Sequence, residues 1–350
     1  MKINKLNLQK ALFIVKPGLA HSEVLEQTTS FAFLKGRVVT YNDEISISHP
    51  LKGIDFTGAI KAEELYGLLT RLDQEEVQIE KTKNEIKISS GRVKAGLKLE
   101  EKVNLPLRKI PKEWIKFKDP TQFVYFLGLA MQTCSTDMSK PKLTCVYVRE
   151  DGAVIGSDGF RIVYCQGHGT SVKDFLIPAS NVREVISILP THIYLEEGWA
   201  HFKNKEGTVI SCRRVNDEYV PIDQLEGALK VSKKCEEIEF PKKIEAMLDR
   251  GKQFARQNNF SDEIVNIKID NGKLYMSARA DETGSWIEEK ASIKSKTEVA
   301  FGVTPSLFEK ILTMSHTCLL DQKGKKIKFI MNDVFGGDCE YLIMLAYPKK

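Results

Sequence analysis

An internal repeat constrains the fold of this chain more than any other feature of its sequence. Apolar residues at helical spacing begin at Leu8, and similar patterns begin at Phe123 and Ile244, 115 and then 121 residues further on. Asp119-Pro120 and Pro241 stand before the second and third patterns, where helices commonly start. A chain of 350 residues is expected to form more than one domain, so three copies of one unit predict three similar domains.

A predicted β-hairpin follows each helical pattern. Lys35-Gly36, Asp151-Gly152 and Asn271-Gly272 each separate two strand-like runs, and Asp-Gly and Asn-Gly are strong hairpin signals. The glycines are 116 and 120 residues apart, which matches the spacing of the helical patterns. The agreement between two independent features supports a true repeat.

The second half of each third repeats a strand followed by a short helix. The three copies are 60–69, 177–186 and 303–312, and further strand-like runs follow the first and the last. The sequence therefore predicts an α+β fold of three repeated domains, each with two short helices packed on antiparallel sheets. The predicted domain boundaries are 1–113, 114–234 and 235–350.

The composition is that of a soluble globular protein, with 42% hydrophobic and 28% charged residues and a net charge of +5. The seven cysteines include no Cys-x-x-Cys pair, which favours free thiols in a reducing compartment and therefore the cytoplasm. The longest apolar run, 123–131, is too short to span a membrane.

Catalytic signatures are absent from the sequence. It has no P-loop, no Gly-x-Gly-x-x-Gly after a strand, no Gly-x-Ser-x-Gly and no His-Glu-x-x-His. The six histidines are scattered without the spacing of metal ligands. We therefore expect no enzymatic activity, no cofactor and no metal.

One short segment, Ser157-Asp158-Gly159-Phe160-Arg161-Ile162, reads as a sharp corner between two strands, with Asp158 bonding its own backbone two residues on. It resembles the Thr-Asp-Gly-His-Arg-Leu signature of the bacterial replicative sliding clamp, the beta subunit of DNA polymerase III. The resemblance extends over the whole chain, because these clamps have the same three-part build. The remaining sequence is divergent, and it does not distinguish a divergent bacterial clamp from one encoded by a phage or plasmid.

The resemblance implies a DNA sliding clamp, a processivity factor that closes as a homodimeric ring around double-stranded DNA and tethers the replicative polymerase. It implies that the helices line the hole and contact phosphates without sequence preference. The expected DNA-facing residues are Lys10, Lys16, Lys61, Arg71, Arg183, Lys242, Lys243, Arg250, Lys252, Arg256 and Lys310.

The resemblance also implies an apolar pocket for short peptides of the DNA polymerase, the clamp loader and other clients. Its expected lining is Leu143, Ser157, Gly159, Phe160, Arg161, Ile162, Pro221, Leu342, Ile343 and Met344. Phe160 stands where the family has His, which should make the pocket more apolar. The C-terminal tail also departs from the family's ending.

Ring closure in the family joins the first domain of one chain to the third domain of the other. By position, Val93–Leu99 would meet the segment around Arg256–Phe260 of the second copy. Two alternatives stay open at this point. One is a repair or checkpoint clamp with other clients, and the other is an α+β enzyme that uses Asp158 and Arg161.

Overall fold

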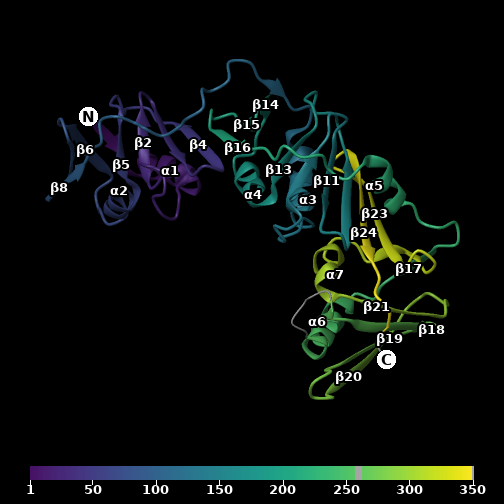
Figure 1. Cartoon of the computed structure of the whole chain (residues 1–350). Helices are drawn as coiled ribbons and strands as arrows, with labels where there is room; N and C mark the ends of the chain where they lie inside the picture. The colour runs from purple at the N-terminus through teal and green to yellow at the C-terminus, as the bar shows by residue number, and fades with distance from the viewer. Residues whose placement is uncertain (257–261, 349–350) are drawn as a thin grey trace. The chain divides into compact units, whose positions relative to one another are not determined.

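The computed structural model describes residues 1–256 and 262–348. Its contacts divide the chain into two compact units (Figure 1). Unit 1 comprises Met1–Val124 and Thr170–Asn216, and unit 2 comprises Tyr125–Gly169 and Asp217–Lys350. Both units include part of the predicted middle domain, so the three domain boundaries stay predictions.

Unit 1 combines short helices with many antiparallel strands. Its helices are α1 (Lys5–Val15), the 3-10 turn η1 (Lys16–Gly18), α2 (Ala62–Leu69), the start of α3 (Pro120–Met131) and α4 (Ala179–Ser187). Its strands are β1 (Lys2–Asn4), β2 (Ser30–Leu34), β3 (Arg37–Tyr41), β4 (Ile45–Pro50), β5 (Gly58–Lys61), β6 (Glu76–Lys81), β7 (Glu85–Ser90), β8 (Val93–Lys98), β9 (Ile115–Lys116), β13 (Phe175–Pro178), β14 (His192–Glu196), β15 (Trp199–Lys203) and β16 (Val209–Arg213).

Unit 2 has the same mixture of elements. Its helices are the rest of α3, the 3-10 turn η2 (Pro141–Thr144), α5 (Ile222–Leu229), α6 (Ile244–Ala255) and α7 (Pro305–Leu312). Its strands are β10 (Cys145–Val148), β11 (Ala153–Ser157), β12 (Arg161–Gln166), β17 (Glu236–Glu239), β18 (Val265–Asp270), β19 (Lys273–Arg279), β20 (Trp286–Ser292), β21 (Val299–Val303), β22 (Thr317–Asp321), β23 (Lys326–Val334) and β24 (Gly337–Met344).

Each unit contains a long sheet in which strands of two successive thirds pair directly. In unit 1 the order is β5–β2–β3–β4–β16–β15–β14–β9, and β4 pairs with β16. In unit 2 the order is β10–β11–β12–β24–β23–β22–β17, and β12 pairs with β24. Two shorter sheets, β1–β6–β7–β8 and β20–β19–β18–β21, end at β8 and at β20. The predicted α+β fold with antiparallel sheets is confirmed.

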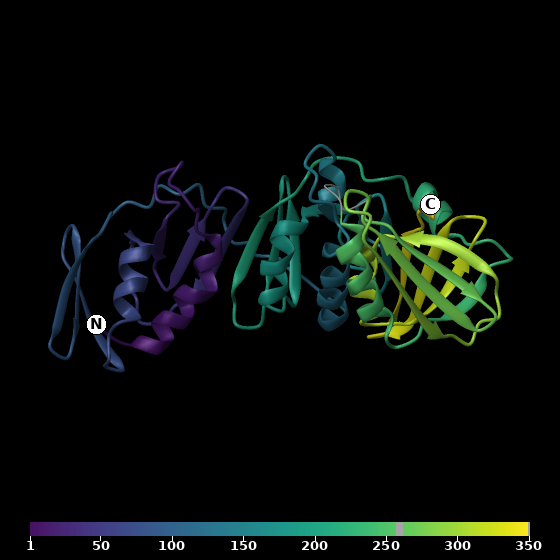
Figure 2. The same ribbon diagram turned by 90° about the horizontal axis from the view of Figure 1, so that it is seen from below.

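The predicted helices form where the apolar spacing placed them. In α1 the Asn4 side chain accepts a hydrogen bond from Asn7 N at 3.0 Å, which caps the helix start. The buried residues of α1 are those of the predicted stripe, Leu8, Ala11, Leu12 and Val15. The same holds for Ile244, Met247 and Leu248 in α6. Figure 2 shows α1, α2 and α4 on one side of the unit 1 strands.

The hairpin turns also follow the sequence. Asn271 and Gly272 have φ values of 47° and 76°, as a two-residue type I′ turn between β18 and β19 requires. A residue with a side chain adopts this conformation with difficulty, apart from Asn and Asp. The turn therefore needs these two residue types.

The segment after β8 packs against the strands instead of forming a free linker. Leu105 is 7% exposed and lies in one apolar cluster with side chains of β2, β3 and β15. We call this the connector cluster, and its members are Ala32, Tyr41, Leu105 and Trp199, with Val103 and Leu107 at its margin. The guanidinium of Arg108 lies over the Trp199 ring, with its centre 5.5 Å from the ring centroid. This contact extends the packing beyond the cluster.

Candidate functional site

The turn between β11 and β12, residues 157–161, is held by side chain to backbone hydrogen bonds. We call it the Asp158 corner. Asp158 Oδ1 accepts from Phe160 N and Arg161 N, both at 2.9 Å. Ser157 Oγ accepts from Gly159 N at 3.2 Å and donates to Arg161 O at 2.9 Å. Gly159 has a φ of 91°, which explains the glycine. The predicted bond from Asp158 to its own backbone is confirmed.

Each of the three nitrogens of the Arg161 guanidinium donates a hydrogen bond within the chain. Nε donates to Asp158 Oδ2 at 2.9 Å, one terminal nitrogen to Gln132 O at 3.0 Å and the other to Tyr341 Oη at 3.3 Å. The Arg161 side chain is only 15% exposed. Burial disfavours its charge, but Tyr341 and Asp158 outweigh that effect and raise the pKa of Arg161. Arg161 therefore joins the end of α3, the corner and β24.

β24 lies beside the corner, as the sequence analysis expected, but of its three expected lining residues only Met344 is exposed. Leu342 pairs with Ile162 and Ile343 with Arg161, and Leu342 and Ile343 are 1% and 0% exposed. Their burial does not fit the expectation that they line an open pocket, because their side chains belong to the core. Met344 is 43% exposed, and its N–H donates to Phe160 O at 2.8 Å.

The other expected lining residues differ in exposure. Phe160 is 42% exposed, and Ile162 is half-buried. Leu143 is half-buried in η2, and Pro221 is exposed directly before α5. The exposed apolar groups at the corner are therefore Phe160 and Met344.

A pocket of about 530 Å³ opens next to the corner and includes Phe160 and Arg161. Its other walls were not expected from the sequence: they come from the loop after α3 and from Leu307 at the start of α7. The full lining is Cys134, Ser135, Thr136, Asp137, Lys140, Asp158, Phe160, Arg161, Ser306 and Leu307. These segments lie far apart in the sequence, and no short motif marks them.

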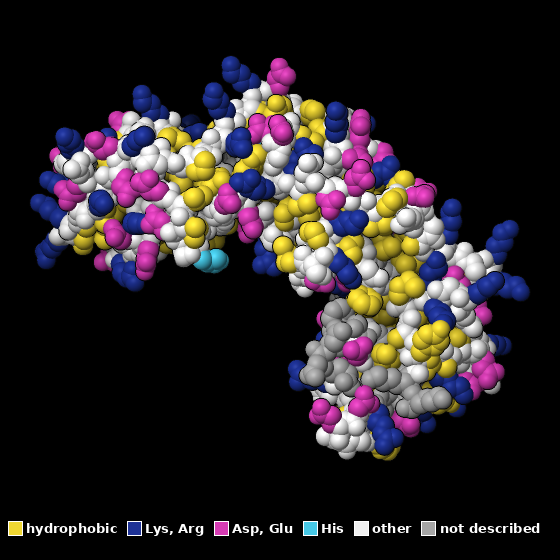
Figure 3. Space-filling view, in the orientation of Figure 1, with side chains coloured by type: hydrophobic (Ala, Val, Ile, Leu, Met, Phe, Trp, Pro, Cys, Tyr) yellow, Lys and Arg dark blue, Asp and Glu magenta, His cyan; other side chains and the backbone are white. Residues whose placement is uncertain are grey.

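The expected DNA-facing cations lie on or beside helices, but some are already paired with carboxylates. Arg250 meets Glu289 at 2.8 Å, Lys252 meets Glu309 at 2.6 Å, and Lys61 is paired with Glu23. The exposed members are Lys10, Lys16, Arg71, Arg183, Lys242, Lys243, Arg250, Arg256 and Lys310. On the face seen in Figure 3, cations and anions are interspersed.

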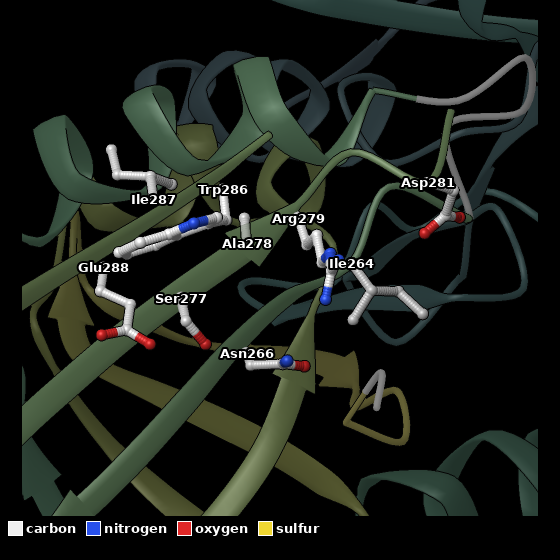
Figure 4. Close-up of a pocket in the computed structure, with 9 residues that line it drawn as sticks. All are labelled: Ile264, Asn266, Ser277, Ala278, Arg279, Asp281, Trp286, Ile287 and Glu288. Carbon is white, nitrogen blue, oxygen red and sulfur yellow. The ribbon is translucent and has the colours of Figure 1, made fainter. Parts of the chain in front are cut away.

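A further pocket, of about 340 Å³, lies on the sheet that ends at β20. Figure 4 shows its side chains, which come mainly from β18, β19 and β20. Trp286 opens β20 and is 64% exposed, beside Arg279 and Glu288 of the same pocket. The sequence analysis did not identify this surface.

The described part of the chain contains no cluster of His, Cys, Asp or Glu side chains suited to hold a metal ion. None of its described helices is long and apolar enough to cross a membrane. Asp158 and Arg161, the pair considered for an enzyme, are both engaged in the bonds that build the corner.

These features, antiparallel sheets that join successive thirds of the chain with short helices packed against them, define an α+β architecture built from repeated units. No family model and no curated protein matches the sequence. Solved structures that share the fold include DNA polymerase III beta subunits. That of Pseudomonas aeruginosa has a TM-score of 0.85 at 12% identity, covering 99% of this chain and 100% of that one.

Two other beta subunits give the same result. That of Streptococcus pneumoniae has a TM-score of 0.85 at 16% identity, and the Bacillus subtilis sliding clamp has 0.83 at 16%, each covering 99% of both chains. At identities this low the likeness establishes the fold. The chain has the fold of the bacterial sliding clamps, and the predicted resemblance is confirmed at that level.

Proposed function

We propose that this chain is a DNA sliding clamp, a processivity factor that encircles double-stranded DNA and tethers a polymerase. The observation that supports the proposal is the match of the fold over 99% of the chain to DNA polymerase III beta subunits. The clamp itself performs no catalysis. Its role is mechanical, because a closed ring stays on DNA through topology while phosphate contacts permit sliding.

Two strands at the ends of their sheets, β8 and β20, suit ring closure by pairing between two copies of the chain. Within the chain, β4 pairs with β16 and β12 with β24, each time joining two successive thirds. β8 and β20 end the sheets of the first and last thirds. An antiparallel pair between β8 of one copy and β20 of another would repeat the same junction and close a homodimer.

The side chains on these edges suit such a pair. Val93 on β8 is 46% exposed and Trp286 on β20 is 64% exposed, and exposed large apolar groups often mark contact surfaces. β8 also carries two lysines, Lys94 and Lys98, whereas β20 carries two glutamates, Glu288 and Glu289, and one lysine, Lys290. Opposite charges across the two strands would favour this pairing over β8 with β8. The expected contact around Arg256–Phe260 includes residues 257–260, which lie outside the described residues.

The second proposed surface receives client peptides at the Asp158 corner. Phe160 and Met344 expose apolar area there, and the hydrogen bond from Met344 N to Phe160 O holds the two backbones together. Apolar contacts supply affinity, and polar groups at the rim orient the peptide. The replicative polymerase and the clamp loader are the proposed partners.

The function is tested by retention on circular DNA. The chain, loaded by a clamp loader, should remain on a nicked circle during gel filtration and leave after the circle is linearised. Trp286→Ser should shift the chain toward monomer in sedimentation and abolish retention, while Leu189→Ser, at a site 65% exposed after α4, should change neither. Equal loss from circular and linear DNA by the unmodified chain would refute the clamp function.

A further inference from the structure

Two cysteines lie directly opposite each other at the junction of β12 and β24. Cys165 of β12 is the register partner of Cys339 of β24 in this antiparallel pair. Their Sγ atoms are 2.7 Å apart, and both residues are 0% exposed. The two positions are separated by 174 residues, and they lie in the predicted middle and last domains.

This geometry is close to that of a disulfide. Residues directly opposite in an antiparallel pair have Cβ atoms about 4.5–5.5 Å apart, near the ~3.5–4.5 Å of a disulfide. The sulfurs need only approach to about 2.05 Å, which small side-chain rotations can supply. Cys134, by contrast, directs its Sγ to the carbonyls of Ala130 and Cys145, both at 3.3 Å.

We propose that Cys165 and Cys339 are an oxidisable pair that forms a disulfide across the β12–β24 junction when the folded protein meets a peroxide. One thiol is oxidised to a sulfenic acid as the peroxide O–O bond breaks and a first water leaves. The second thiol then attacks that sulfur, the S–S bond forms, and a second water leaves. The two thiols lose two hydrogens, and hydrogen peroxide is reduced to two waters.

The bond would tie together the two segments that carry the proposed client surface. Arg161 pairs with Ile343 in the same two strands, four residues from the cysteines on each strand. Burial is the largest effect on Cys165, and its pKa is raised well above the usual range, so the reactive thiolate is scarce. The oxidation should therefore be slow, and the disulfide, once formed, should persist and stabilise the folded protein.

Thiol counting on the full chain tests the proposal. The reduced protein is treated with hydrogen peroxide, quenched, denatured and alkylated. The seven free thiols should fall to five, the intact mass should drop by two hydrogens, and digestion without reductant should link the peptides of Cys165 and Cys339. Reduction should restore all seven, and the oxidised form should unfold at higher denaturant concentration.

Cysteine variants distinguish oxidation of the Cys165–Cys339 pair from general oxidation of the thiols. Cys165→Ala and Cys339→Ala should each abolish the linked peptide and the stability gain, whereas Cys318→Ala, which removes another buried thiol, should keep both. The unmodified chain itself provides the decisive result if a variant fails to fold. Seven alkylated thiols after oxidation, sulfonic acid without crosslinking, or a disulfide between other cysteines would overturn the proposal.

Discussion

At the scale of single residues, Arg161 shows where sequence reasoning succeeds and where it stops. The corner itself was predictable, because the bonding pattern of Asp158 depends on its nearest neighbours. The role of the Arg161 guanidinium was not. We expected it to meet a bound peptide, but its partners Gln132 and Tyr341 come from segments 29 and 180 residues away. Only folding brings such partners together.

Replacing Asp158 tests this structural role. Asp158→Ala removes the acceptor of two backbone N–H groups and the anion beside Arg161, whose side chain is 15% exposed. We expect the free energy of unfolding to fall by about 2–4 kcal/mol, because a largely buried cation is then without its anion. Urea unfolding measures this change. Asp137→Ala, in an exposed turn, should cause a much smaller one.

Phe160 and Met344 give a second prediction at this scale. Phe160→Ala and Met344→Ala each remove exposed apolar surface, so folding and dimerisation should be unaffected. The affinity for an apolar peptide from the C terminus of the polymerase should fall by about 5- to 150-fold, or ~1–3 kcal/mol. Fluorescence anisotropy with a labelled peptide measures it. Leu189→Ala is the matched control, and unchanged affinity in both variants would place the client site elsewhere.

At the scale of elements, the helices and hairpins were predictable and the connections between thirds were not. Periodicity marks α1 and α6 because their neighbours in sequence share one buried face. The boundaries were predicted near residues 113 and 234, but the sequence did not predict how the segments before them pack. Leu105 is buried in the connector cluster, and Leu229 is buried at the end of α5. Such burial depends on a surface made by distant strands, so local sequence does not reveal it.

Asp321 anchors the second connection and gives it a pH dependence. Its side chain is buried and accepts from Ser232 N and Ser232 Oγ, both at 2.9 Å, and from Gly324 N at 2.9 Å. Burial disfavours its charge, but these bonds and Lys326 outweigh that effect and lower its pKa. A carboxyl with a lowered folded pKa stabilises the protein above its unfolded pKa of about 3.9, and the stabilisation is lost as pH falls through the folded pKa.

The prediction is that Asp321→Asn lowers the free energy of unfolding by about 1–3 kcal/mol at neutral pH. The difference from the unmodified chain should shrink below about pH 4, because the carboxyl of Asp321 becomes neutral in the unfolded chain and then, at lower pH, in the folded chain as well. Urea unfolding at several pH values measures both quantities. A difference that stays constant down to pH 2 would show that the charge of Asp321 has no role.

At the scale of the whole molecule, the proposed ring requires positive charge in particular places. A sliding protein needs cations that face phosphates, and net charge alone does not supply them. The structure separates the expected cations into two groups. Arg250 and Lys252 pair with Glu289 and Glu309, whereas Lys10 of α1 and Arg183 of α4 are exposed and form no ion pair with another described residue. Sequence spacing could not distinguish paired from unpaired cations, because Glu289 lies 39 residues from Arg250 and Glu309 lies 57 residues from Lys252.

The last prediction uses that difference within unit 1, where α1 and α4 lie on the same side of the strands (Figure 2). Lys10→Gln with Arg183→Gln should weaken association with duplex DNA and flatten its salt dependence. The slope of log affinity against log salt should change by about 0.9 for each phosphate that the variant no longer neutralises. Lys87→Gln with Lys205→Gln removes the same charge from exposed positions on β7 and the β15–β16 turn, outside the helices, and should leave the slope nearly unchanged. Anisotropy of a labelled duplex over a salt series measures both slopes. Equal slopes for the two double variants would mean that α1 and α4 do not face the DNA, even if the chain closes a ring.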